Sequence, residues 1–105
     1  EPLILFSDET DSLTCEIPDA KGYAYLSFLM QKPENSSDCS VRVYDGSGAL
    51  LTEFHSAQLE TDEEWHRYTI AFPKGNDTVS IVFCGEESVG NSIEKYPSFK
   101  EIILY

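Results

Sequence analysis

The sequence feature that most constrains the fold is a strict alternation of apolar with polar or small side chains on both sides of one turn. The apolar side chains fall on every second position of residues 64–72 and 78–84, at Tyr68, Ile70 and Phe72 and then at Val79, Ile81 and Phe83. A period of two is that of a β-strand with one buried face. Pro73 cannot donate to a central ladder, and Gly75-Asn76-Asp77 has the chemistry of a turn. The stretch therefore predicts strand, tight turn and strand, which we interpret as a hairpin.

The rest of the chain repeats this pattern. Further strands are predicted at residues 3–6, 12–17, 23–31, 39–44, 49–54 and 99–105. Asp45-Gly46-Ser47-Gly48 predicts a tight hairpin turn, and residues 85–98 predict a long loop. No segment has a helical period of apolar residues. About eight strands at this spacing predict an all-β jelly-roll β-sandwich of antiparallel strands in two sheets, with residues 1–105 as one domain.

The net charge of the chain limits the classes of molecule that it is expected to bind. The formal net charge is -12, which disfavours nucleic acids and anionic membrane surfaces because their phosphates are repelled. No apolar run approaches membrane-spanning length, so no membrane insertion is expected. A solvated acidic surface is the simplest interpretation of the charge. It is compatible with neutral ligands and with cationic partners.

The number of cysteines predicts a core with at most one disulfide. Cys15, Cys39 and Cys84 are an odd set, so at most one internal disulfide can form. None lies in a C-x-x-C pair, and a zinc site is not expected. Cys15 and Cys39 share parity with their apolar strand neighbours, which predicts that both point inward. The sequence leaves one bridge and three free thiols as alternatives.

Catalytic motifs are absent from the sequence. His55 and His66 are the two histidines, and neither belongs to a His-Glu-x-x-His motif or accompanies a nucleophile elbow. A dyad of Cys84 or Cys39 with either histidine stays open, although ordinary sheet-surface histidines are the simpler interpretation. We therefore expect no catalytic residues and predict that the chain is not an enzyme.

A set of aromatic and arginine side chains is the candidate binding site. Strand parity places it opposite the core side chains of the same strands, at Tyr23, Tyr25, Arg42, Tyr44, Trp65 and Arg67. The apolar C–H faces of sugar rings pack on aromatic planes, and arginine and tyrosine hydrogen-bond to hydroxyls. If these side chains share one trough, it would bind a polysaccharide. The alternative is that Trp65 covers one end of the core and that the tyrosines are ordinary outer-face residues.

Beyond parity, the strands resemble two families. The resemblance is carried by Tyr25-Leu26-Ser27-Phe28, Val41-Arg42-Val43, Trp65-x-x-Tyr68-x-Ile70-x-Phe72, Val79-x-Ile81-Val82-Phe83 and Phe99-Lys100-Glu101-Ile102-Ile103-Leu104. The pattern resembles CenC-like carbohydrate-binding modules first and MAM domains second. The first resemblance implies a non-catalytic module on a polysaccharide such as a plant cell-wall glucan, xylan or mannan. The second implies an extracellular adhesion or assembly domain with a protein partner.

Metal binding is not expected, in spite of oxygen-rich segments. CenC-like modules often carry an aspartate pair before the last strand, and Lys100 and Glu101 occupy those positions here. A lysine is electrostatically wrong for a calcium ligand. Residues 8–11 offer oxygen ligands without the spacing of a defined calcium loop, and a solvated acidic loop is the simpler interpretation. We expect no cofactor.

Two further features bear on the resemblance and on localisation. MAM domains usually carry two disulfides, which three cysteines cannot supply. Residues 35–37 and 76–78 each fit the N-glycosylation acceptor and fall in predicted loops. In a eukaryotic protein these acceptors suit an extracellular or cell-surface domain.

Overall fold

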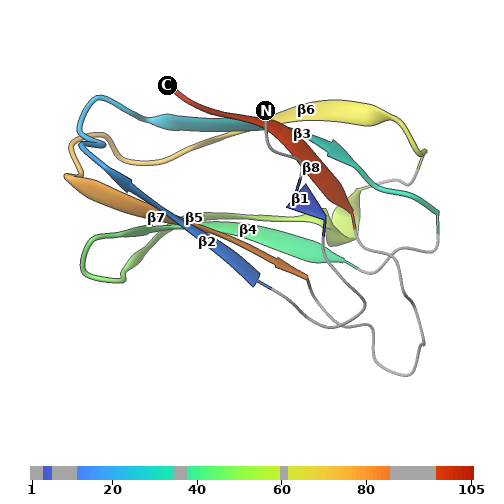
Figure 1. The fold of residues 1–105 in the computed structure, drawn as a ribbon, viewed down its shortest axis with the longest axis horizontal. Coiled ribbons are helices and arrows are strands. Elements are labelled where there is room, and N and C mark those ends of the chain that lie inside the picture. The colour runs from blue at the N-terminus through green and yellow to red at the C-terminus, as the bar shows by residue number, and fades with distance from the viewer. Residues whose placement is uncertain (1–3, 6–11, 35–37, 60–61, 86–96) are drawn as a thin grey trace.

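The computed structural model describes residues 4–5, 12–34, 38–59, 62–85 and 97–105, and shows two β-sheets packed face to face (Figure 1). The strands are β1 (Ile4–Leu5), β2 (Ser12–Pro18), β3 (Tyr25–Gln31), β4 (Cys39–Asp45), β5 (Leu50–His55), β6 (Trp65–Ala71), β7 (Thr78–Gly85) and β8 (Ser98–Leu104). One 3₁₀ turn, Ser56–Gln58, follows β5. None of the described segments forms a helix long and apolar enough to cross a membrane.

The strand order is that of a jelly roll. One sheet, here the β3 sheet, has the order β1-β8-β3-β6, and the other, the β4 sheet, has the order β2-β7-β4-β5. Every pairing is antiparallel. The pairs β4–β5, β3–β6, β2–β7 and β1–β8 nest around the turn between β4 and β5, so that the chain resembles one long hairpin rolled into two layers. The predicted fold class is confirmed.

The predicted hairpin of β6 and β7 is wrong. β6 pairs with β3, whereas β7 pairs with β2 and β4, so the turn between them passes from one sheet to the other (Figure 1). Phe72 is buried as the chain leaves β6, and the carbonyl of Asp77 accepts a 2.9 Å hydrogen bond from Ala20 N at the start of β7. Alternation identifies a strand and its buried face, but it does not identify the strand's partner. The hairpin of β4 and β5 was predicted correctly.

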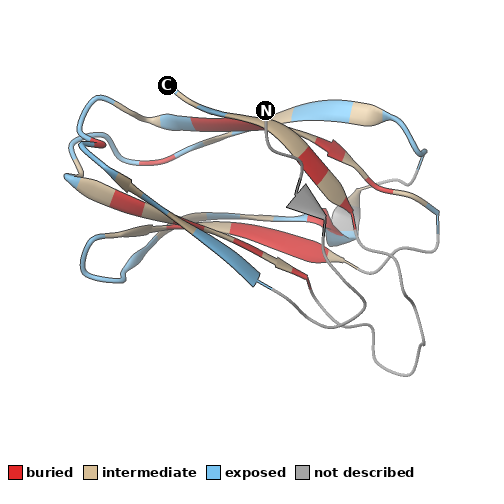
Figure 2. Ribbon diagram, viewed as in Figure 1, coloured by how far each residue is buried: buried red, intermediate tan, exposed pale blue. Residues whose placement is uncertain are grey.

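The core lies between the sheets, where the inward residues of both layers are buried (Figure 2). Phe28, Phe83 and Phe99 form its centre, with ring centroids 5.1–6.5 Å apart in edge-on or T-shaped contacts. Each buried phenylalanine contributes roughly 1.5–3 kcal/mol of transfer free energy. The remaining buried apolar residues are Ala20, Leu26, Met30, Cys39, Val41, Val43, Phe72, Val79 and Ile81.

Some expectations about individual residues change. β3 begins at Tyr25, and Tyr23 lies in the loop before it, where it packs against the core. A 3.0 Å hydrogen bond from Tyr23 N to the carbonyl of Ala20 turns the chain there. Cys15 and Cys39 face inward as predicted, and no disulfide joins any two of the three cysteines.

Several predictions fall on residues that the structure does not describe. They are the ends of the strand at 3–6, the acidic loop at 8–11, the glycosylation acceptor at 35–37 and most of the loop at 85–98.

Candidate functional site

The outer face of the β3 sheet gathers three of the predicted site residues. We call it the Trp65 face and define it by the outward residues of β3, β6 and β8 with the residue after β8: Tyr25, Ser27, Leu29, Gln31, Trp65, Arg67, Thr69, Ala71, Ser98, Lys100, Glu101, Ile103 and Tyr105. In the registers, Trp65 lies opposite Gln31 and Arg67 lies opposite Leu29, which is also paired with Lys100. The face is thus a surface of three adjacent strands.

A tryptophan and a lysine occupy one end of this face. The Lys100 ammonium lies over the Trp65 ring, with its Nζ 4.2 Å from the ring centroid. Such a cation–π contact is attractive by about 0.5–1 kcal/mol at an exposed site. Gln31 Nε2 donates a 2.7 Å hydrogen bond to the carbonyl of Glu63. The loop that leads into Trp65 is thereby held against β3.

Arg67 lies across the middle of the face. Its Nη1 donates 2.8 Å to Ser27 Oγ and 3.4 Å to the carbonyl of Glu101, and its Nη2 contacts Glu101 Oε1 at 3.3 Å. Glu101 has a positive φ of 50° where the pairing of β8 with β3 shifts register. The bulge turns the Glu101 backbone and side chain toward the guanidinium, which is therefore held between Ser27 and Glu101.

Two tyrosines form the other end. The rings of Tyr25 and Tyr105 have centroids 5.8 Å apart. The exposed fractions are 46% for Tyr25, 54% for Tyr105 and 42% for the neighbouring Ile103. Tyr25 and Gln31, the partner of Trp65, are six positions apart on β3, or about 20 Å at roughly 3.3 Å per residue. The face thus carries an aromatic surface at each end and an arginine between them.

The other three predicted site residues lie elsewhere. Arg42 and Tyr44 are on the outer face of the β4 sheet, on the far side of the sandwich, and Tyr23 packs against the core. Arg42 Nε contacts Glu53 Oε2 at 3.3 Å. A hydrogen bond from His55 and the Arg42 guanidinium hold the pKa of Glu53 below its usual range. The six predicted residues therefore do not form a common trough.

Sequence reasoning missed Tyr105 and the role of Lys100. Both belong to the face because β8 pairs with β3, and the sequence gives no signal for that pairing. Tyr105 lies directly opposite Tyr25, with mutual backbone hydrogen bonds of 2.8 and 3.0 Å. Parity within the last strand would have placed Lys100 and Ile103 on its outer side only after the bulge at Glu101 was known.

The open Cys–His dyad does not form in the structure. On the outer face of the β4 sheet, Ser40 lies opposite His55 on one side and Cys84 on the other, so one strand separates the histidine from that thiol. Cys39 faces the core. Ser40 is fully buried, and its Oγ has no hydrogen-bond partner within the described part of the chain. A hydroxyl without exposed surface is not positioned to meet a substrate.

Three polar side chains gather before and within β6. The ligand atoms of Asp62, Glu64 and His66 lie within 4.8 Å of one another, and all three residues are exposed. His66 Nε2 is 2.6 Å from Asp62 Oδ2, and Glu64 N donates to Asp62 Oδ1 at 3.1 Å. These hydrogen bonds lower the pKa of Asp62. The three side chains therefore lie together because His66 pairs with Asp62 and because Asp62 closes a turn at the edge of the sheet.

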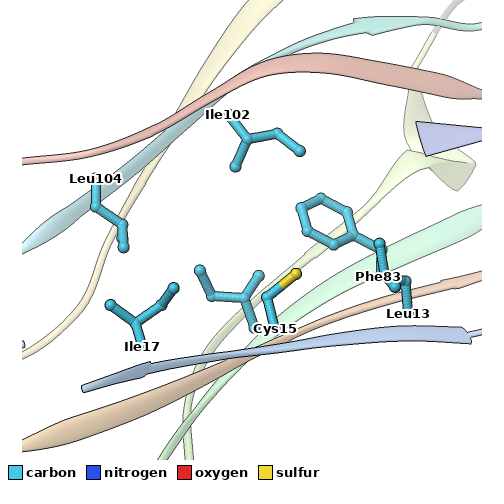
Figure 3. Close-up of a pocket in the computed structure, with 7 residues that line it drawn as sticks. Leu13, Cys15, Ile17, Phe83, Ile102 and Leu104 are labelled. Atoms are coloured by element: carbon cyan, nitrogen blue, oxygen red, sulfur yellow. The ribbon is translucent and has the colours of Figure 1, made fainter. Parts of the chain in front are cut away.

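An apolar pocket of about 290 Å³ lies between the two sheets (Figure 3). Leu13, Cys15, Ile17, Ile81 and Phe83 of the β4 sheet line it, together with Ile102 and Leu104 of β8. The side chains of β8 point toward those of β2 across the opening. The lining side chains include no hydroxyl, amide or charged group, and the Cys15 thiol is a weak donor, so the pocket is poorly suited to a sugar. The pocket and the Trp65 face are on different sides of β8.

Comparison with known proteins identifies the fold and no family. No family model matches the chain, and no curated protein matches it by sequence. Nine chains of solved structure match. One is the enzymatically active domain of tailspike protein 4 of bacteriophage CBA120, with 18% identity over 91% of this chain and a TM-score of 0.55. The chain spans 14% of the length of that tailspike chain. At this identity the similarity concerns the fold alone.

Two expectations change with this comparison. The prediction that the chain is not an enzyme is contradicted, because the matching structure is described as an enzymatically active domain. The lack of a catalytic motif in the sequence therefore does not exclude catalysis for a chain with this fold. The resemblances to CenC-like modules and MAM domains find no matching family model, and the shared feature that remains is the two-sheet, all-β architecture.

Proposed function

We propose that this chain binds a polysaccharide on the Trp65 face. The observation that carries the proposal is the arrangement of Trp65 at one end, Tyr25 with Tyr105 at the other, and Arg67 between them, all on adjacent strands of one sheet. Tyr25, Tyr105 and Ile103 are three of the five large hydrophobic side chains that the described residues expose. Exposed apolar groups that cluster on one face are typical of a binding surface.

The chemistry of the face suits a sugar chain. The aromatic rings provide apolar planes for the C–H faces of the sugar, and the spacing of about 20 Å between the ends favours a chain over a single sugar. A guanidinium has five N–H groups, so Arg67 retains donors for hydroxyls beside its contacts with Ser27 and Glu101. A preformed sheet surface loses little conformational entropy on binding. A polysaccharide ligand suits a place outside the cell or at its surface.

The fold that this chain shares with part of an enzymatically active tailspike domain supports a role beside such an activity.

Affinity electrophoresis on a panel of soluble glucans, xylans, mannans and polyuronates tests the proposal. We expect at least one polymer to retard the protein. Trp65→Ala or Tyr25→Ala should weaken binding about tenfold or more, because stacking of a ligand ring on an aromatic side chain contributes roughly 1–3 kcal/mol. Tyr44→Ala is the matched control, because Tyr44 is an aromatic residue on the opposite sheet.

The outcomes separate clearly. Retardation that survives Trp65→Ala and Tyr25→Ala but is lost with Tyr44→Ala would move the site to the β4 sheet. No retardation on any polymer, acidic ones included, would reject carbohydrate binding by this chain.

A further inference from the structure

The Trp65 face differs in charge from the rest of the molecule. The described residues contain six lysines and arginines, and two of them, Arg67 and Lys100, lie on this face. Its strand residues carry one carboxylate, Glu101, so the face has a formal charge of 2 - 1 = +1 on a chain of net charge -12. The strand residues of the face thus have a net positive charge on an acidic protein, and three acidic residues, Asp62, Glu63 and Glu64, stand in the loop before Trp65.

The two cations are not equivalent. Glu101 partly neutralises Arg67 through its contact of 3.3 Å with Nη2. Lys100 has the Trp65 ring as its neighbour, and no carboxylate of the described residues forms an ion pair with it. A lysine ammonium has three N–H donors, and an aromatic ring engages only the side that faces it. Lys100 therefore presents a charged donor at the edge of the aromatic surface.

This position affects neutral and acidic sugars differently. A neutral ring that stacks on the covered side of Trp65 must displace the ammonium and lose the cation–π contact. A ring that bears a carboxylate can lie beside the ammonium and accept a charge-assisted hydrogen bond from it, which is roughly twice as strong as a bond between neutral groups. The position of Lys100 over Trp65 thus opposes binding of a neutral sugar and favours binding of an acidic one.

We propose that the polysaccharide bound by the Trp65 face is an acidic one, a chain of uronic acids, and that Lys100 determines this specificity. This inference rests on the proposed function of the same face. Repulsion from the acidic surface of the protein does not override the local contact, because at 0.15 M ionic strength charges beyond about 8 Å are largely screened. Lys100 is a specificity residue, and Trp65 supplies the stacking surface for either class of sugar.

Titration calorimetry at 0.15 M NaCl with polygalacturonate and with its fully methyl-esterified form tests the inference. The two polymers have the same sugar and differ in the charge of the carboxyl groups. We expect polygalacturonate to bind about two- to fivefold tighter than the ester, the size of effect that one exposed charge contact gives. We expect Lys100→Gln to abolish this difference and Lys100→Arg to retain it. Lys74→Gln, which removes an exposed charge from the loop after β6, should leave it unchanged.

The outcomes distinguish the inference from the proposed function. Equal affinity for both polymers, or a preference that survives Lys100→Gln, would overturn the role of Lys100 and leave sugar binding in place. Binding to neutral glucans with no binding to either form of polygalacturonate would also overturn it. Binding to none of these polymers would remove the proposed function as well.

Discussion

At the scale of single residues, the structure rests on a buried lysine that the sequence pattern does not single out. The Lys32 side chain is 8% exposed, and its Nζ donates 2.5 Å to the carbonyl of Ser56 and 3.1 Å to that of Leu59. Asp38 Oδ1 is 3.2 Å away. Ser56 also accepts a 2.8 Å hydrogen bond from Cys39 N through its Oγ. The ammonium thus ties the residue after β3 to two carbonyls of the 3₁₀ turn, and Ser56 ties the same turn to the start of β4.

Lys32→Met should therefore destabilise the protein by about 1–3 kcal/mol, since it removes both hydrogen bonds of the buried ammonium and its ion pair with the partly exposed Asp38. Lys74→Met removes a solvated charge and should change stability by less than about 0.5 kcal/mol. Urea denaturation followed by tryptophan fluorescence measures both. Equal effects of the two substitutions would contradict the role assigned to Lys32.

At the scale of elements, the turn between β4 and β5 is built around one aspartate and one glycine. Asp45 Oδ1 accepts hydrogen bonds of 2.9 Å from Ser47 N, 2.7 Å from Ser47 Oγ and 2.9 Å from Ala49 N. Gly48 has a φ of 91°, a backbone conformation that residues with a Cβ rarely adopt. Asp-Gly-Ser-Gly between alternating strands is a strong local signal, which explains why this hairpin was predictable.

Gly48→Ala should cost about 1–2 kcal/mol, because a Cβ is strained at positive φ although the surrounding space is open. Gly22→Ala is the control, since Gly22 also has open space around it but no positive φ. That substitution should be neutral, or stabilise by up to about 1 kcal/mol through the unfolded state. Thermal unfolding of the two variants checks this, and an equal loss of stability in both would contradict the role assigned to φ at Gly48.

Asp45 in this turn and two further carboxylates make the stability of the protein depend on pH in the acid range. The hydrogen bonds from Ser47 and Ala49 lower the pKa of Asp45, and contacts with neighbouring donors lower those of Glu53 and Asp62. A carboxyl whose pKa is lower in the folded state stabilises the fold above its ordinary pKa of about 4, and this contribution is lost as the pH falls through the folded-state value. We expect urea midpoints to fall between pH 5 and pH 2 as these carboxylates gain protons. In Asp45→Asn the fall should be smaller, and an identical slope in both proteins would contradict the assignment.

At the scale of the whole molecule, alternation predicted the strands and their buried faces, but it did not predict the site. Residues at the ends of β3, β6 and β8 meet only through long-range pairing. The local sequence does not show that Tyr25 and Tyr44 belong to different sheets. Both residues are outward, and the topology puts them on opposite sides. For the same reason the jelly-roll order was expected from strand count and resemblance, whereas the crossing of β6 to β7 between sheets was missed.

The packing of the two sheets yields one more prediction. Cys15 lines the apolar pocket between β2 and β8, and a leucine there would fill part of it. Cys15→Leu should therefore stabilise the protein by about 0.5–2 kcal/mol. Val43→Leu, at a fully buried position in the packed centre, should destabilise it by about 1–3 kcal/mol through overpacking. Chemical denaturation of both variants decides whether the pocket is open space, because a loss of stability in Cys15→Leu would mean that it is not.

Amide chemical shifts of the ¹⁵N-labelled protein, followed during titration with the polymer that retards it, show which face of the sandwich binds the polysaccharide. We expect shifts concentrated on β3, β6 and β8, including the Trp65 indole N–H, with the outer residues of β4 and β5 unaffected. Shifts concentrated around Arg42 and Tyr44 on the β4 sheet would contradict this expectation.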